Sequence, residues 1–245
     1  MISRIDYPDG SSESFGYGPR GLLVSAVDRA GGISRYEYDR RGLLRRIIGP
    51  GGGATEYLRD GNGRITRISR GDSGSGSGFS AAARHTDIEY DVRGNITQIT
   101  DPEGRVRRWE YDDDSRPVRY IDERGEVTRY EYPEPGTKVS IDPMGGRTQT
   151  TRDPDGRIIE RRDASGRRWT ITREELPDGL REIITLPSGA RWVNKYDDQE
   201  RLVRTLSPEG VVESRKYRED TDGSTLIHRR GDLVETGRFD TWGNP

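Results

Sequence analysis

The sequence predicts an all-β protein, a long meander of short antiparallel strands that forms a curved β-strip and spans residues 1–245 as a single domain. Two observations lead to this prediction. A turn motif of the form Asp-x-x-Gly recurs at short intervals, and the segments between the turns are rich in β-branched and aromatic residues. Because these segments hold only about six or seven residues, they are too short for stable helices, and consecutive segments must pair antiparallel.

The repeated tetrad has the chemistry of a turn. Its aspartate can accept a hydrogen bond from the backbone two residues on, and glycine at the fourth position readily adopts a positive φ. Variants that lack the aspartate end at Gly136, Gly189 and Gly210. Complete tetrads include Asp28–Gly31, Asp39–Gly42, Asp60–Gly63, Asp91–Gly94, Asp101–Gly104, Asp122–Gly125, Asp142–Gly145, Asp153–Gly156, Asp163–Gly166 and Asp240–Gly243.

Several predicted strands carry two aromatic residues separated by one residue. Because side chains alternate between the two faces of a strand, such a pair lies on one face. One face of the strip is therefore expected to carry rows of aromatic side chains, and aromatic, Thr and Arg–Glu pairs between strands can stabilise a sheet that has few aliphatic residues. The aromatic pairs are Tyr36 and Tyr38, Trp109 and Tyr111, and Tyr130 and Tyr132.

The isoleucines of other strands do not follow this alternation. Ile65 and Ile68 are three positions apart, as are Ile96 and Ile99. An odd spacing places two side chains on opposite faces of a regular strand. Two alternatives are open: both faces of the strip are partly covered, or a β-bulge between the two isoleucines returns them to one face.

Composition supports an ordered repeat, although aliphatic residues are scarce. Leu, Ile, Val and Phe account for 45 of the 245 residues, which is below the roughly 20% at which disorder becomes a concern. However, the net charge is only −2, and the chain contains 12 Tyr and 4 Trp. A strip in which each strand contacts mainly its neighbours needs no deep aliphatic core. One segment, at about residues 69–84, is rich in Gly and Ser and predicts a flexible excursion.

Several functional classes are excluded or disfavoured. The chain has no cysteine, so disulfides, thiolate catalysis and thiolate zinc sites are excluded. No apolar run is long enough for a transmembrane helix, and the first ten residues lack the apolar core of a signal peptide. The two histidines, His85 and His228, are far apart in sequence, which disfavours a histidine-based metal site or active site. We expect no metal and no cofactor.

Three binding or catalytic functions are alternatives to a purely structural role. Arginine with aromatic residues can bind nucleic acid, but here nearly every arginine is matched by an acid and the pI is about 5.9, so no nucleic acid is expected. Most carboxylates occupy the repeated turn position, so no pair is singled out for catalysis, and an enzyme is not expected. A sheet rich in Tyr and Trp can stack on sugars, which leaves a surface carbohydrate- or cell-wall-binding module as the alternative function.

The motif Tyr-Asp-x-x-Gly followed by Asn, Arg or an aliphatic residue resembles the YD repeat of Rhs proteins. It occurs at Tyr38-Asp39-Arg40-Arg41-Gly42 and Tyr90-Asp91-Val92-Arg93-Gly94, and it recurs with variation to Pro245. The resemblance implies a hollow, cocoon-like shell wound from a β-strip, of the kind also found in insecticidal toxin complexes and teneurins. Asp142-Pro143-Met144-Gly145 looks similar to that family's C-terminal self-cleavage core, but more repeats follow it, so an ordinary turn is expected there.

The same resemblance implies partners and a location. This chain would be a segment of the wall that encapsulates a C-terminal toxin or other passenger polypeptide encoded downstream, and the full-length protein would attach to a secretion spike such as that of type VI secretion. The protein would reside in the bacterial cytoplasm before export and would then be secreted or held at the cell surface. An unpaired strand at the edge of a sheet can pair with a strand of another chain, so self-association through the edges is also expected.

Overall fold

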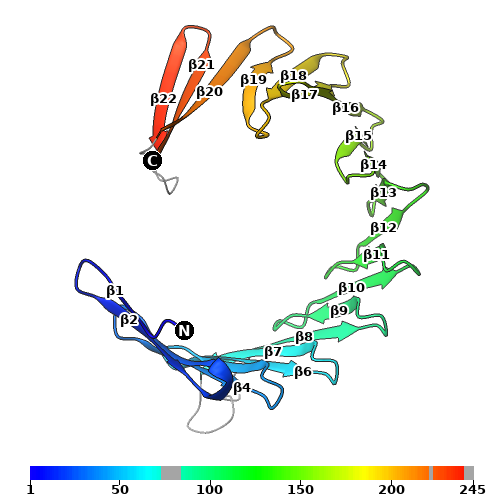
Figure 1. Ribbon diagram of the computed structural model, residues 1–245. Coiled ribbons are helices and arrows are strands. Elements are labelled where there is room, and N and C mark those ends of the chain that lie inside the picture. The colour runs from blue at the N-terminus through cyan, green and yellow to red at the C-terminus, as the bar shows by residue number, and fades with distance from the viewer. Residues whose placement is uncertain (73–83, 221–222, 240–245) are drawn as a thin grey trace. The chain divides into compact units, whose positions relative to one another are not determined.

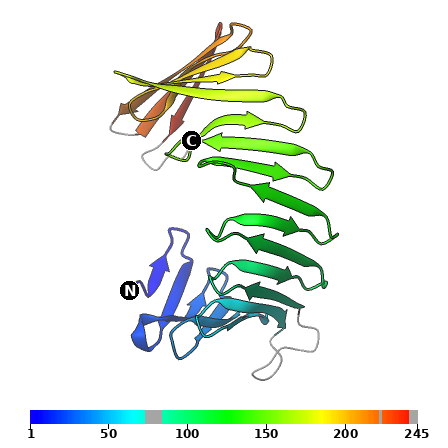
Figure 2. The same cartoon turned by 90° about the vertical axis from the view of Figure 1, so that its right-hand side faces the viewer.

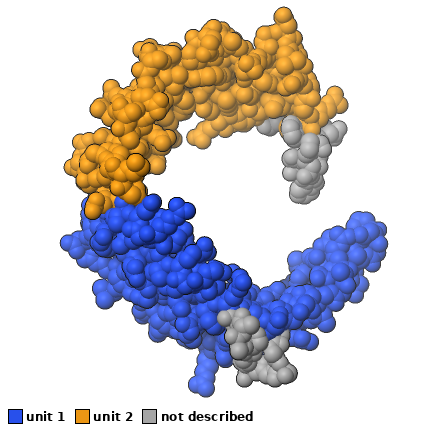
Figure 3. Space-filling model, turned by 180° about the vertical axis from the view of Figure 1, so that it is seen from behind, with its two compact units in different colours: residues 1–127 blue, residues 128–245 orange. Residues whose placement is uncertain are grey.

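The computed structural model of the chain describes residues 1–72, 84–220 and 223–239. Its backbone is almost entirely β-structure, with 22 strands and, among the described residues, a single short helical element, the 3-10 turn at Pro19–Gly21 (Figures 1 and 2). The prediction of an all-β chain of short antiparallel strands is confirmed. Residue contacts divide the chain into two compact units, residues 1–127 and 128–245 (Figure 3). The prediction of one domain over residues 1–245 stays a prediction.

The first unit contains eleven strands that follow one another in an antiparallel meander. Each strand pairs with the next along the chain, from β1 to β11. The strands are β1 Arg4–Asp6, β2 Ser12–Tyr17, β3 Leu23–Val27, β4 Ile33–Tyr38, β5 Leu44–Ile48, β6 Gly53–Arg59, β7 Ile65–Asp72, β8 Arg84–Tyr90, β9 Ile96–Thr100, β10 Val106–Tyr111 and β11 Pro117–Ile121.

The second unit repeats this arrangement with strands β12 to β22, each paired antiparallel with the next. The strands are β12 Val127–Glu131, β13 Thr137–Ile141, β14 Arg147–Arg152, β15 Ile158–Arg162, β16 Arg168–Leu176, β17 Gly179–Thr185, β18 Arg191–Tyr196, β19 Leu202–Leu206, β20 Val212–Asp220, β21 Gly223–Arg230 and β22 Leu233–Phe239.

A β-bulge near the start of many strands explains the irregular isoleucine spacing. In the β6–β7 pair, Arg59 lies opposite Ile65 and Tyr57 lies opposite Ile68, because Thr66 is an extra residue in β7. Arg59 and Tyr57 share a face, so the two isoleucines share it too. Ile96 and Ile99 are returned to one face in the same way, by an extra residue in β9. Of the two alternatives, the structure therefore has the bulge.

Equivalent bulges recur through both units. The register shifts next to Tyr17, Tyr38, Arg59, Tyr90, Tyr111, Arg152 and Tyr196, and each time the extra residue is the second residue of the following strand. The bulged strands are β3, β5, β7, β9, β11, β15 and β19. A bulge increases the local twist of a strand and bends it. The meander is thus bent repeatedly: six of the seven bulges come just after a turn of the Tyr-Asp type or its Arg variant, and the bulge in β3 follows Tyr17-Gly18.

The sheet is a single layer with very little core. Among the described residues, the buried hydrophobic side chains are those of Ala54 and Val139. The accessible surface is 16778 Å², whereas a compact monomer of this mass would expose about 11,000 Å². Most strand residues are half-buried, because each side chain is covered by its neighbours on the same face and not by a second layer.

The Gly/Ser-rich segment lies between two long strands. Residues 69–72 form the end of β7, and Arg84 begins β8. The rest of the predicted excursion, residues 73–83, lies outside the described residues.

Candidate functional site

The repeated turn has a fixed set of hydrogen bonds, which the Asp39 turn illustrates. The Asp39 carboxylate accepts bonds from the backbone N–H groups of Arg41 and Leu43, each at 2.9 Å. The backbone closes the turn from Gly42 N–H to the Asp39 carbonyl at 3.0 Å and from Asp39 N–H to the Leu43 carbonyl at 2.9 Å. Gly42 has a φ of 81°, a conformation that glycine adopts at little cost. One carboxylate thus binds two N–H groups of the loop.

The same arrangement is found at the other predicted turns. The carboxylate accepts N–H groups two and four residues on at Asp28, Asp60, Asp91, Asp101, Asp122, Asp142 and Asp163, and the N–H four residues on at Asp153. The fourth-position glycines have a positive φ: Gly31, Gly42, Gly63, Gly94, Gly104, Gly125, Gly145, Gly156 and Gly166. Asp142-Pro143-Met144-Gly145 is one of these turns. Asp240–Gly243 lies outside the described residues.

Two further turns of this kind escape the Asp-x-x-Gly search because another residue replaces the glycine. Asp112 and Asp197 make the same two carboxylate hydrogen bonds, and the fourth positions are Ser115 and Glu200, each with a φ of 60°. The signal that could have found them is the residue before the aspartate: Tyr111 and Tyr196 complete the Tyr-Asp pair. The Asp112–Asp114 acidic run is thus part of a turn.

An arginine at the fifth position of many turns adds a charge contact. The second carboxylate oxygen of the turn aspartate accepts from this arginine at 2.6–2.8 Å in the pairs Asp60–Arg64, Asp101–Arg105, Asp112–Arg116, Asp163–Arg167 and Asp197–Arg201. At Asp163, partial burial acts to raise the pKa, but hydrogen bonds from Ser165 and Arg167 and the charge of Arg167 outweigh it and lower the pKa to about 2. The aspartate is therefore held in its ionised form.

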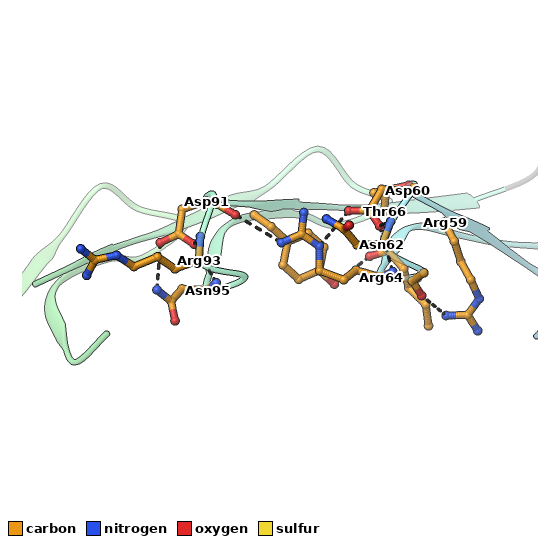
Figure 4. Close-up of polar contacts among 12 residues, drawn as sticks. Arg59, Asp60, Asn62, Arg64, Thr66, Asp91, Arg93 and Asn95 are labelled. Carbon is orange, nitrogen blue, oxygen red and sulfur yellow. Dashed lines mark hydrogen bonds and ion pairs between the residues drawn. The ribbon is translucent and has the colours of Figure 1, made fainter. Parts of the chain in front are cut away.

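In the first unit, side chains also join the turns at Asp39, Asp60, Asp91 and Asp112 to one another along the same side of the sheet (Figure 4). The Arg64 guanidinium donates to the Asp91 carbonyl at 3.2 Å and lies 4.7 Å from the centre of the Tyr90 ring. Asn95 bridges onward, because its amide donates to the Asp91 carboxylate at 2.9 Å and to Ser115 Oγ at 3.1 Å. Similarly, Arg41 donates to the Gly61 carbonyl at 2.9 Å, and Arg93 donates to Asp113 Oδ1 at 2.9 Å.

A tyrosine in the strand after a bulged strand makes a second recurring contact; it directly precedes a turn aspartate at Tyr38, Tyr90 and Tyr111, and it precedes Arg218 at Tyr217. Its hydroxyl donates to the backbone carbonyl of the residue that begins the preceding, bulged strand, for example from Tyr90 to Ile65 at 2.8 Å. The other pairs are Tyr38–Leu23, Tyr111–Ile96 and Tyr217–Leu202, and Tyr17–Ile2 is similar. Arginine replaces tyrosine at Arg59, which donates to Leu44, and Arg173, which donates to Ile158. We call these contacts the carbonyl latches.

The predicted aromatic residues of the first unit lie on one face. Strand register places Tyr36, Tyr57, Ile88 and Trp109 on the same face of the first unit, and Trp109 contacts Tyr120 with ring centres 5.3 Å apart. Tyr38 and Tyr111 lie on this face and form carbonyl latches. In the second unit, Tyr130 lies in β12 with Lys138 over its ring at 4.1 Å, and Tyr132 follows the strand. All six predicted aromatic residues are half-buried.

The described residues show no metal-binding cluster. They contain no group of three or more His, Asp or Glu side chains that could hold a metal ion. His85 contacts Ser69 Oγ at 2.9 Å, and His228 lies between Glu213 and Glu235 at 3.4 and 3.5 Å. Within the same described ranges, no helix is both long and apolar enough to cross a membrane.

Comparison with known proteins identifies the repeat. The family model described as RHS Repeat matches residues 90–127, a segment that begins at the Tyr90-Asp91 turn. This match confirms the resemblance to Rhs repeat proteins that the Tyr-Asp motif predicts. No curated protein sequence matches the chain.

Three solved structures align with most of the chain at low similarity. The crystal structure of TcdB2-TccC3 aligns at 11% identity and a TM-score of 0.34 over 94% of this chain and 20% of that chain. A Tc holotoxin pore from Photorhabdus luminescens aligns at 12% identity and 0.30, over 95% and 17%. A porin-like protein from Bacteroides uniformis aligns at 12% identity and 0.28, over 84% and 93%. This chain thus spans about a fifth of the length of the toxin-complex chains.

Removal of one latch hydroxyl should weaken the fold measurably. We expect Tyr90→Phe to lower the free energy of unfolding by about 1 kcal/mol, because it deletes the hydrogen bond to the Ile65 carbonyl and retains the ring. Tyr57→Phe is the matched control, since the Tyr57 hydroxyl has no hydrogen-bond partner among the described residues. Urea unfolding followed by circular dichroism compares the two variants, and equal losses would contradict a role for the latch.

The two turns without glycine should be strained. We expect Glu200→Gly to raise the free energy of unfolding by about 1 kcal/mol. A non-glycine residue at positive φ is strained by about 1–2 kcal/mol, and glycine removes this strain. Part of the gain is offset because glycine has more conformational freedom in the unfolded chain. Asp198→Gly, in the same turn but at negative φ, should be neutral or destabilising. The same urea titration measures both variants, and a gain in Asp198→Gly equal to that in Glu200→Gly would rule out relief of strain.

The turn aspartates should make stability depend on pH in the acid range. Asp163 has a pKa of about 2 in the folded protein against an ordinary value of 3.8, so it binds a proton more readily in the unfolded chain at pH 3. The contribution of ionised Asp163 to the stability of the folded protein is fully present above about pH 4 and is lost as the pH falls through about 2. Thermal melts at pH 7, 4, 3 and 2 should show a falling midpoint below pH 4, with a smaller fall in Asp163→Asn.

Proposed function

We propose that this chain is a structural segment of an Rhs-type shell and forms part of a wall that encapsulates a C-terminal toxin domain or other passenger polypeptide. The proposed role is non-enzymatic. The observation that carries the proposal is a single-layer sheet of repeated Tyr-Asp hairpins whose residues 90–127 match the RHS Repeat model.

The single-layer construction suits a wall. The accessible surface, 16778 Å², exceeds the roughly 11,000 Å² of a compact monomer because both faces of the sheet are available within each unit. One face carries half-buried aromatic side chains. Aromatic rings offer a large contact area and can pack against both apolar and polar groups. Such a face can lie against a polypeptide whose sequence varies, which is what the wall of a container for different passengers requires.

The stabilising contacts suit a wall that is built by repetition. Carboxylate turns, bulges and carbonyl latches join each hairpin only to its neighbours. Stability in such an array is a sum over units and their nearest-neighbour contacts. The number of hairpins can therefore be set by the volume to be enclosed, without redesign of a central core.

Partners and location follow from the same proposal. The passenger would be encoded downstream in the same gene, and a secretion spike, for example that of type VI secretion, would carry the full-length protein. The protein would stay in the bacterial cytoplasm until export and then be secreted or displayed at the surface.

Expression of the complete reading frame tests this proposal. We expect the gene to encode further repeats and a distinct C-terminal domain after codon 245, and we expect that domain to resist trypsin within the full-length protein but to be digested when expressed alone. A frame that stops after Pro245 and yields a stable protein, or equal digestion of the domain in both forms, would contradict it. An unrelated fusion partner on the same domain is the control.

A surface carbohydrate- or cell-wall-binding module is the second candidate, because one tryptophan of the second unit is open to solvent. Trp192 is 37% exposed, and the register from β15 to β18 places it on the same face as Trp169. An indole ring of this kind can stack on a sugar ring. Tryptophan fluorescence titration with purified cell-wall polysaccharide tests this role: binding that is lost in Trp192→Ala supports it, and no response at millimolar sugar excludes it.

A further inference from the structure

One face of strands β17 to β21 in the second unit carries a cluster of basic side chains, which we call the basic face. Trp169 and Trp192 lie on the opposite face. On the basic face, residues 191–196, 202–206, 212–218 and 224–230 contribute no acidic side chain. The cations that the strand register places there are exposed except for Lys195, which is half-buried: Arg181, Arg191, Lys195, Arg204, Lys216 and Arg229.

Most of these cations have no acidic partner. Arg181 pairs with Glu174, and Lys195 pairs with Asp178 at 2.6 Å. Both acids lie at the border of the cluster, in β16 and in the turn that follows it. The other four cations form no ion pair within the part of the chain that the structure describes: Arg191, Arg204, Lys216 and Arg229.

The other face of the same region is balanced in charge. Arg173 pairs with Glu182 at 2.8 Å, and Arg230 pairs with Glu213 at 3.3 Å. The chain as a whole has a net charge of −2. The excess of positive charge is therefore a property of one face and not of the composition.

Strand register brings the cations of the basic face directly against one another. Lys195 lies opposite Arg181 on one side and opposite Arg204 on the other. Like charges in directly opposite positions destabilise a sheet. An anionic partner would remove this repulsion, so the arrangement favours a binding surface for a molecule with several negative charges.

A row of aliphatic side chains runs beside the cations on the same face. Each of its members lies two residues from a member of the row Arg181, Lys195, Arg204 and Ser214, so the two rows are about 7 Å apart. Val212 is 39% exposed. A partner that covers both rows needs an acidic stripe next to an apolar stripe. The aliphatic row is Ile183, Val193, Leu206 and Val212.

The spacing of the rows favours a helix over an extended chain. Neighbouring strands are about 4.8 Å apart, so the four strands β17 to β20 span about 14 Å. The turns of an α-helix repeat every 5.4 Å and depart from the strand spacing by about 2 Å over this distance. Residues on one side of an extended chain repeat about every 6.8 Å and depart from it by about 6 Å.

Nucleic acid matches this face less well. Binding of single strands relies on aromatic side chains on which the bases stack. The tryptophans and tyrosines of β16 to β21 lie on the opposite face, as the register of Trp169, Trp192 and Tyr217 shows. The aliphatic row also has no counterpart in a phosphate backbone.

We propose that the basic face binds an acidic amphipathic helix of a partner polypeptide, which lies across β17 to β20. The apolar stripe of the helix packs on the row that ends at Val212, and its carboxylates pair with Arg204 and Lys216. About ten residues of helix, or three turns, cover this distance. The proposal does not rest on the shell function, because it concerns one face of these strands.

Fluorescence anisotropy with the whole chain and a labelled peptide of about 18 residues tests this proposal. The peptide carries Leu at every third or fourth position and Glu along the adjoining stripe. A second peptide has the same residues in an order that forms no stripe, and a DNA duplex is the third probe. We expect the first peptide to bind at least five times more tightly than either of the others, and to bind more weakly as salt is added.

A pair of matched variants locates the binding surface. We expect Arg204→Gln to weaken binding of the first peptide about fivefold. Arg161→Gln makes the same change at an exposed arginine on the opposite face and should leave Kd unchanged. Arg204→Gln should not lower the free energy of unfolding in urea, because it removes a like charge opposite Lys195.

Three results would overturn the proposal. Absence of binding at about 100 μM peptide would exclude a useful affinity. Equal or tighter binding of the disordered-order peptide or of DNA would show a surface selected by charge alone. An equal effect of Arg204→Gln and Arg161→Gln would place the contact elsewhere on the protein.

Discussion

The bonds from loop N–H groups to the turn aspartate are the interaction on which this fold depends. A hairpin loop of three residues leaves backbone N–H groups that no strand can satisfy, and the carboxylate of Asp39 or Asp91 accepts two of them at once. That closure fixes where each strand ends and the next begins. The bulge follows immediately after the turn, and the tyrosine immediately before it, so both are placed by the same loop.

In this arrangement, short polar contacts stabilise the fold in place of a hydrophobic core. With so few buried side chains, the stability of the strip comes from ladder hydrogen bonds, from half-buried aromatic and aliphatic pairs, and from the latch bonds that satisfy the first carbonyl of most bulged strands. The arginine at the fifth turn position contributes twice, since Arg64 pairs with Asp60 and also covers Tyr90. Each contact contributes little free energy, but each kind of contact occurs many times. None of them requires a second layer of secondary structure.

Much of this arrangement could be predicted from the sequence, because the repeat is local. The Asp-x-x-Gly turns, the strand segments between them and the shared face of Tyr36 and Tyr38 all follow from residues close together in the chain. The bulge stood as one of two alternatives for Ile65 and Ile68, because spacing alone does not distinguish a bulge from two covered faces. The turns at Ser115 and Glu200 do not follow from the Asp-x-x-Gly pattern, because serine and glutamate take the place of its glycine.

The carbonyl latches were beyond prediction for a different reason. The hydroxyl of Tyr90 and the carbonyl of Ile65 are 25 residues apart, and their approach depends on the register of a bulged hairpin. Once one latch is known, the interval of 15 residues in Tyr38–Leu23, Tyr111–Ile96 and Tyr217–Leu202 makes the others readable from sequence. The arginine variants at Arg59 and Arg173 show that the position requires a donor of sufficient reach and not an aromatic ring as such.

That interval has a consequence for how such chains can change in evolution. The Tyr90–Ile65 latch spans ten more residues than the others, yet its bond has the same length, 2.8 Å, as those of Tyr38 and Tyr111. Four of the ten extra residues lengthen β7 and β8 relative to β3 and β4, at the strand ends away from the Tyr-Asp turns, and the others lie between these two strands in the sequence. One side of the meander is therefore constrained by the latches, whereas the other tolerates insertions. New loops, and any new specificity that they bring, should accumulate on that second side.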